Sequence, residues 1–176
     1  SVVNAEEAGK IWLNDDNTVT YTTINDAVAA GHTGDIIRVS GTFDTTNTAF
    51  RDAVVNNDMT LEFVGNTVIL SDNSLQHGLT IASGSHIKTV NGSILTMKGF
   101  NTALNLQVGS EMNDGFYVFE NNEQVSLNGY INGSARENLV VNVTSNSFSR
   151  LYNDNFHVEN ATVKLNATPI RTDGVY

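Results

Sequence analysis

From Leu61 onward the chain is a succession of short apolar runs separated by turns rich in Asn, Gly and Ser, and this pattern constrains the fold most strongly. None of the runs has the length and the 3.6-residue period of an amphipathic helix. The runs are Leu61–Val64, Val68–Leu70, Leu79–Ile81, Ile87–Val90, Ile94–Met97, Ala103–Val108, Phe116–Phe119, Val125–Leu127, Leu139–Val143, Phe156–Val158 and Val163–Leu165. Many short strands without intervening helices predict an all-β protein, either a β-solenoid or a β-sandwich.

The spacing of the runs distinguishes these two folds. Three pairs of runs recur after 22, 23 and 24 residues: Ile94 to Phe116, Leu104 to Leu127, and Leu139 to Val163. One turn of a parallel β-helix has this length, and each turn stacks its apolar side chains on those of the turn before. Asn-Gly pairs at 91–92, 128–129 and 132–133 suit both the corners of a solenoid and the hairpins of a sandwich. We therefore predict a solenoid, with a β-sandwich as the alternative.

The segment Tyr21–Phe43 predicts a short amphipathic helix, a turn and a buried strand. Apolar and small residues over 24–31 recur with helical period, and Thr23 precedes them as an N-cap. Gly31 is expected to end the helix in the left-handed conformation. The sequences TINDAVAA and GDIIRVSGTF resemble the N-terminal cap and first coil of the pectate-lyase-like proteins. This resemblance implies a right-handed parallel β-helix with an N-terminal helical cap.

Two further elements are expected before the regular coils. Lys10–Tyr21 reads as a hairpin around the Asx-rich turn Asn14–Asn17. Thr46–Asn56 reads as a second helix with Asn47 as its N-cap. We expect one domain that is a fragment of a longer protein, with the hairpin, cap helix and first coil in residues 1–45 and the remaining coils in residues 46–176.

Charge and composition exclude several classes of function. The net charge of −10 and the pI near 4.6 would repel nucleic acid and anionic membranes, so neither is an expected partner. No apolar run is long enough for membrane insertion. The chain has no cysteine, which excludes disulfides, zinc–thiolate sites and thiol catalysis. About one residue in seven is Asn, in keeping with a fold built from many tight turns.

The resemblance raises the question of enzymatic activity, because pectinolytic β-helices are lyases or hydrolases. A lyase needs a basic side chain and an acid-held calcium beside the substrate carboxylate, and a hydrolase needs two carboxylates. Arg51, Arg136 and Arg150 are scattered along the chain, and the hydrolase motifs of the family are not met. We expect no catalytic residue, with a polysaccharide lyase or a glycoside hydrolase as the alternative. A stacked Arg or Lys with carboxylates on one solenoid face would favour that alternative.

Turns rich in Asp and Asn could supply oxygen ligands to a structural calcium ion. These turns are Asn14–Asn17, Asp72–Asn73, Asn113–Asp114 and Asn153–Asn155. None has the spacing of a known calcium loop, and Asx turns at loop corners explain them. The four histidines share no metal-ligand spacing. We therefore expect no cofactor, apart from such a structural calcium.

Aromatic and basic residues on the later coils are the candidate ligand-binding residues. Aromatic rings stack on the apolar faces of sugars, and Arg side chains bond their hydroxyls or carboxylates. The candidates are Tyr117, Tyr130, Arg136, Arg150 and Tyr152. The segment Asn128–Asn138 carries two of them and is the best single candidate for a binding loop.

The chain as a whole resembles the pectate-lyase-like adhesive domains of bacterial surface proteins, which keep the solenoid and lack the catalytic residues. The resemblance implies an extracellular protein, secreted or anchored to the cell wall, that binds a glycan or a protein of a host or cell surface. Further coils or domains are expected after its C-terminus. A structural stalk that binds nothing is the third interpretation.

Overall fold

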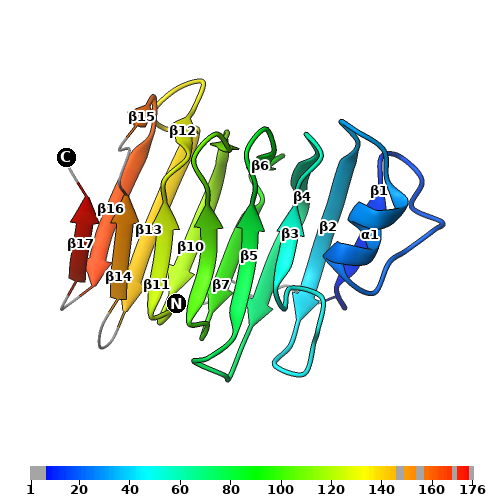
Figure 1. Ribbon diagram of the computed structural model, residues 1–176, viewed down its shortest axis with the longest axis horizontal. Helices are drawn as coiled ribbons and strands as arrows, with labels where there is room; N and C mark the ends of the chain where they lie inside the picture. Colours follow the sequence, from blue (N-terminus) through cyan, green and yellow to red (C-terminus); the bar gives the residue numbers. More distant parts are fainter. Residues whose placement is uncertain (1–6, 146–148, 154–156, 168–169, 175–176) are drawn as a thin grey trace.

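The computed structural model describes residues 7–145, 149–153, 157–167 and 170–174. The elements in chain order are β1 Lys10–Leu13, α1 Ile24–Ala30, β2 Ile36–Phe43, β3 Ala53–Val55, β4 Thr60–Leu70, β5 His77–Ile81, β6 His86–Thr89, β7 Ile94–Lys98, β8 Thr102–Leu106, β9 Glu111–Met112, β10 Gly115–Glu120, β11 Gln124–Leu127, β12 Tyr130–Asn132, β13 Leu139–Ser145, β14 Ser149–Asn153, β15 His157–Glu159, β16 Thr162–Ala167 and β17 Ile170–Gly174. The strands stack along one axis, with α1 at one end (Figure 1).

The fold is a parallel β-solenoid, as predicted. Among the described strands, every pairing is parallel except that of β1 with β2. The strand order β3-β5-β8-β11-β14-β17 forms a six-stranded sheet, to which each pass of the chain contributes one strand. A β-sandwich would need antiparallel hairpins between consecutive strands, so that alternative is wrong.

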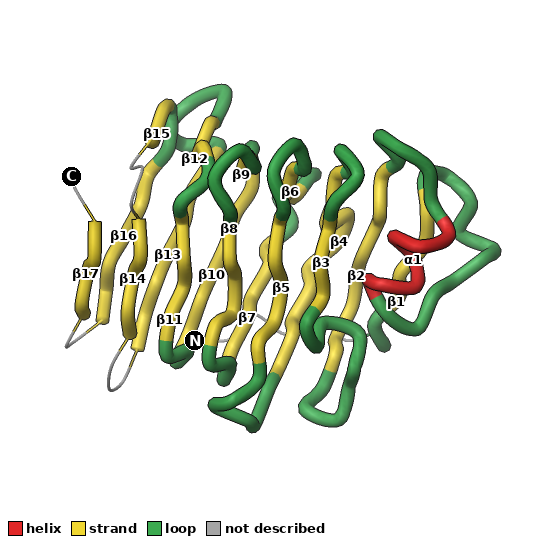
Figure 2. The backbone as a smooth tube through the Cα atoms, viewed as in Figure 1, coloured by secondary structure: helices red, strands yellow, loops and turns green. Residues whose placement is uncertain are grey.

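The larger sheet has 11 strands and bends within β4. Residues 60–63 of β4 pair with β6, whereas residues 67–70 pair with β7. The solenoid therefore has three walls. We call the one formed by the first halves of β2 and β4, followed by β6, β9, β12 and β15, the first wall. Figure 2 shows its short later strands at one edge of the molecule.

The length of a turn varies along the chain. Ile94 pairs with Phe116, as the 22-residue recurrence predicts. The other two predicted pairs are wrong by two residues, because Leu106 is the partner of Leu127 and Val141 is the partner of Val163. A shift of two leaves each side chain on the same face of its strand, so the alternation of inward and outward residues is preserved.

Two sets of hydrogen bonds cover the sheet edges at the N-terminal end. Strand β1 pairs antiparallel with the edge of β2. The side chain of Asn25 in α1 covers the edge of β3: its amide donates to the Asp52 carbonyl at 3.1 Å and accepts from the Val54 N–H at 2.9 Å. Both pairings satisfy strand groups that would otherwise be a template for another chain. The helix thus acts as the predicted cap.

Three local predictions are wrong. Residues 18–21 form no strand: the edge of β1 away from β2 has only an isolated antiparallel bridge from Leu13 to Asp16 and the hydrogen bond from the Tyr21 N–H to the Ile11 carbonyl at 2.9 Å. The predicted helix over Thr46–Asn56 is limited to turns before β3, since Asp52 has a left-handed φ of 48° that ends any right-handed helix. Gly31 is extended, with φ −83°, and not left-handed; a Cβ there would lie 2.6 Å from the Met59 methyl group, which would have to shift.

Candidate functional site

The outer face of the first wall carries two rows of polar side chains in register. The inward-facing residues on five successive passes are fully buried, so the residues beside them point outward: Ile37, Leu61, Ile87, Met112 and Ile131. The first outward row is Arg38, Glu62, Lys88, Asn113, Asn132 and Glu159. The second row is His86, Glu111, Tyr130 and His157.

Glu62 lies between two cations of the first row. Its carboxylate is 2.7 Å from an Arg38 guanidinium nitrogen and 3.7 Å from the Lys88 ammonium. The Glu62 side chain is only 10% exposed, whereas that of Lys88 is 39% exposed. An ionised carboxylate at this depth needs such partners. Arg38 has a second carboxylate beside it, that of Asp15 at 3.5 Å. The Lys88 ammonium has three donors and faces Glu62 at 3.7 Å, so its hydrogen-bonding capacity is only partly used.

Glu111 organises the middle of both rows. Its carboxylate accepts hydrogen bonds from the side-chain amides of Asn113 and Asn132, at 3.1 and 2.8 Å. His86 Nδ1 lies 2.8 Å from Asn113 Oδ1 and 3.8 Å from the Glu111 carboxylate. Three successive passes of the chain are thereby joined by side chains, which fixes the orientation of each amide group.

Tyr130 extends the network toward the C-terminal end. Its hydroxyl donates to the Glu159 carboxylate, and its ring meets the ring of His157 edge to face, with centroids 3.9 Å apart. The hydrogen bond to Glu159 raises the pKa of the Tyr130 hydroxyl. The tyrosine therefore remains a neutral donor near pH 7.

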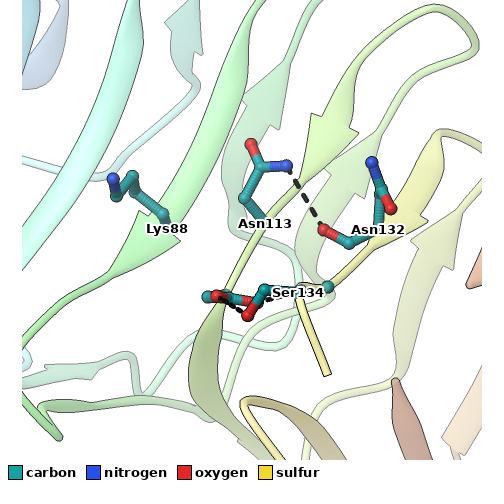
Figure 3. Close-up of a pocket in the computed structure, with 6 residues that line it drawn as sticks. Lys88, Asn113, Asn132 and Ser134 are labelled. Atoms are coloured by element: carbon teal, nitrogen blue, oxygen red, sulfur yellow. Dashed lines mark hydrogen bonds between the residues drawn. The ribbon is translucent and has the colours of Figure 1, made fainter. Parts of the chain in front are cut away.

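A groove of about 310 Å³ opens on this face, lined by Lys88, Asn113, Asp114, Asn132, Gly133 and Ser134. Figure 3 shows Lys88 on one side of Asn113, Asn132 on the other, and Ser134 below them. The Asp114 carboxylate accepts from the Ser134 N–H at 2.7 Å and from its hydroxyl at 2.5 Å. These bonds hold the loop after β12 against the groove.

Two other hollows lie away from the first wall. One, of about 150 Å³ on the six-stranded sheet, has a lining of His77, Gly78, Leu79, Thr80, Thr102, Asn105, Gln124 and Ser126. The other, of about 430 Å³ near the N-terminal end, contains Asp44, whose carboxylate is bonded to Thr46. Neither hollow is lined by Lys or Arg. We therefore take the groove beside Lys88 as the candidate site.

The sequence-predicted site residues are not brought together. Tyr117 is 1% exposed, and its hydroxyl donates to the backbone carbonyls of Asn113 and Ile87 at 3.0 and 3.2 Å. Burial raises its pKa well above the ordinary value for tyrosine. Tyr117 thus supports the first wall from inside and cannot act as a surface platform.

The other four candidates divide between two walls. Tyr130 lies on β12 in the second outward row, and Arg136 lies exposed in the loop that follows Ser134. The backbones of Arg150 and Tyr152 lie on β14, in the six-stranded sheet. The predicted binding loop Asn128–Asn138 is partly regular, because Tyr130–Asn132 forms β12.

Arg38, Glu62, Lys88 and Glu111 were missed as site residues. The signal was present, since Arg38, Glu62 and Lys88 follow one another at intervals of 24 and 26 residues. It becomes readable only when charged residues are tested for the solenoid period in the way apolar residues are. The stack of two cations with two carboxylates on one face is the feature that was expected to favour an enzyme.

Some residues of the Asx-rich turns bond within their own turn, whereas others, such as Asn14 with the Ile36 N–H, bond to a distant segment. Asp16 accepts from Thr18, and Asn73 accepts from the Leu75 N–H. Within the described ranges, no group of three or more His, Asp or Glu side chains is arranged to hold a metal ion. Residues 154 and 155 of the fourth predicted turn lie outside the described residues.

Comparisons with family models, curated proteins and solved structures find no match to this chain. The likeness of Tyr21–Phe43 to the pectate-lyase-like proteins therefore remains a resemblance of one segment. In the described part of the chain, no helix has the length and apolar character needed to cross a membrane.

Proposed function

We propose that this protein is a non-catalytic, extracellular ligand-binding solenoid of a bacterial surface protein, secreted or wall-anchored, and that it binds a glycan through the outer face of its first wall. The observation that carries the proposal is the pair of outward rows, which align amide, ammonium, carboxylate and phenol groups over successive passes of the chain.

The groups around the groove are of the kind that bind sugars. Lys88 offers N–H donors, and Asn132 offers an amide oxygen. Tyr130 lies in the neighbouring row, where an aromatic ring can pack against the apolar face of a sugar. The cross-strand hydrogen bonds of Glu111 hold the amides in place before a ligand arrives, which lowers the entropic cost of binding.

The contacts of the carboxylates favour binding over catalysis. Glu62 is committed to two cations, Glu111 to two amides and Asp114 to Ser134. A general acid or base must be free to exchange a proton with the substrate. Against this, the stacking of Arg38 and Lys88 with Glu62 and Glu111 favours the alternative, a polysaccharide lyase or hydrolase.

One experiment tests both interpretations. The protein is incubated with a panel of plant and host glycans, with and without calcium, and each sample is assayed for bound protein and for shortened or unsaturated sugar. We expect binding without product. Lys88→Ala should weaken binding about ten-fold, the effect of losing one charge-assisted hydrogen bond of about 1.5 kcal/mol.

Lys98→Ala is the matched control. Lys98 is also 39% exposed and lies 3.7 Å from a carboxylate, that of Glu120, but it belongs to β7 on another wall. Binding should survive this change. Product formation would overturn the non-catalytic proposal, and the absence of both signals would favour a protein partner or a stalk. Tyr130→Ala and Arg136→Ala then test the two remaining candidates near the groove.

A further inference from the structure

We propose that the groove beside Lys88 selects neutral, hydroxyl-rich sugars and discriminates against sugars that carry a carboxylate. This inference rests on the proposed glycan-binding function and adds the class of sugar. It follows from two independent properties of the groove, namely its charge and its balance of hydrogen-bond donors and acceptors.

The charge around the groove is negative despite the exposed lysine. Two cations of the first row, Arg38 and Lys88, already face Glu62. Glu111 lies behind the two groove amides, and Asp114 lines the groove itself. Asp15 also faces Arg38, and the loop after Ser134 adds Arg136 and Glu137, one charge of each sign. Three cations therefore stand against five carboxylates, in a protein whose net charge is −10. A ligand carboxylate would enter a region of like charge.

The hydrogen-bonding groups of the groove also require donors from the ligand. The amide nitrogen of Asn132 is bonded to Glu111, which leaves its oxygen to accept. The Asp114 carboxylate accepts two hydrogen bonds from Ser134 and, when ionised, has lone pairs left for a ligand hydroxyl, and Lys88 is a donor. A sugar hydroxyl can donate to the first two groups and accept from the third. A carboxylate in the position of that hydroxyl can only accept, so it would satisfy Lys88 and leave the Asn132 oxygen and Asp114 without a donor.

Asp114 is the group whose charge can be removed with the least change in shape. In Asp114→Asn the remaining carbonyl oxygen can still accept from the Ser134 N–H, while the negative charge is lost. We expect this variant to bind carboxylate-bearing sugars better than the wild type does. A gain of binding cannot result from misfolding.

Asp16→Asn is the matched control for this gain. Asp16 accepts from the backbone N–H and the hydroxyl of Thr18, as Asp114 does from Ser134, but it lies in the turn after β1. The substitution changes the net charge of the protein by the same amount. Any gain shared by the two variants would therefore reflect overall charge.

The experiment uses matched pairs of polymers. Each acidic glycan of the panel, such as polygalacturonate, is offered alongside the same polymer with its carboxyl groups reduced to alcohols, and binding is measured by calorimetry at low and high salt. We expect the reduced form to bind more tightly by about two- to five-fold, the range for one exposed charge contact. Salt should narrow the difference by screening the repulsion. Asp114→Asn should also narrow it, and Asp16→Asn should leave it unchanged.

The outcomes distinguish a failure of the proposed sugar selectivity from a failure of the proposed glycan binding. Equal or tighter binding of the acidic forms overturns the selectivity and leaves glycan binding intact. Equal effects of Asp114→Asn and Asp16→Asn overturn the role of the groove. Failure of every polymer, acidic or reduced, to bind removes the glycan-binding proposal and the inference with it.

Discussion

Single residues decide where the chain can turn between walls. Gly99 has φ +87°, and a Cβ placed there would lie 1.9 Å from the Ser71 carbonyl oxygen. Gly99→Ala therefore meets both an unfavourable backbone conformation and a collision with another backbone segment. We expect a loss of about 3 kcal/mol or more in the free energy of unfolding, measured by urea denaturation.

Gly92→Ala separates the two causes. Gly92 also has a positive φ, of +71°, but no atom lies within 4 Å of the position its Cβ would take. This variant should lose only the conformational contribution, about 1–2 kcal/mol. Similar losses in both variants would show that the Ser71 contact does not matter.

At the scale of elements, Asn25 is the contact through which α1 closes the six-stranded sheet. Asn25→Ala removes the acceptor of the Val54 N–H and the donor to the Asp52 carbonyl. Because both groups lie near solvent, we expect a modest loss of about 1 kcal/mol. Amide hydrogen exchange at Val54 should become much faster, since this N–H would lose its partner.

Thr23→Ala is the control for the helix itself. The Thr23 hydroxyl accepts from the Asp26 N–H at 3.0 Å, and its loss should cost about 1 kcal/mol of helix stability. Asn25 and its bonds to the strand remain in this variant, so Val54 should stay better protected than in Asn25→Ala. Equal exchange rates would mean that the helix as a whole, and not Asn25, protects the edge.

Patterns along the chain could be used to predict an element, whereas contacts between residues distant in sequence could not. The cap helix and the coil period could be predicted because buried apolar residues recur along the chain, as from Met97 to Phe119. The Lys10–Tyr21 hairpin is reduced to an isolated bridge and one hydrogen bond, while the regular ladder of β1 forms with β2, which is distant in sequence. The site failed for the same reason: Glu62 and Lys88 become neighbours only through the parallel register of β4 and β6.

For the whole molecule, the response of stability to pH combines two opposing effects. From pH 7 toward the pI near 4.6, protonation reduces the self-repulsion of a chain with net charge −10, which favours the folded state. Hydrogen bonds from their own turns lower the pKa of Asp16, Asp35 and Asp44 below the ordinary value of 3.8. A carboxyl group with a lowered folded pKa stabilises the protein above its unfolded pKa, and this contribution disappears as pH falls through the folded value.

The melting temperature should therefore rise modestly as pH falls from 7 to about 5, and then fall below about pH 4. High salt should reduce the rise in melting temperature between pH 7 and 5, because it screens long-range repulsion. It should leave most of the fall below pH 4, which comes from the loss of short hydrogen bonds. Thermal unfolding followed between pH 3 and pH 8, at low and high salt, measures both changes. In Asp35→Asn the side chain cannot gain a proton in this pH range. The fall in melting temperature below pH 4 should therefore be smaller by the contribution of Asp35. A melting temperature that still rises below pH 4 would mean that relief of charge repulsion, and not the bonding of these turns, controls the acid stability of the solenoid.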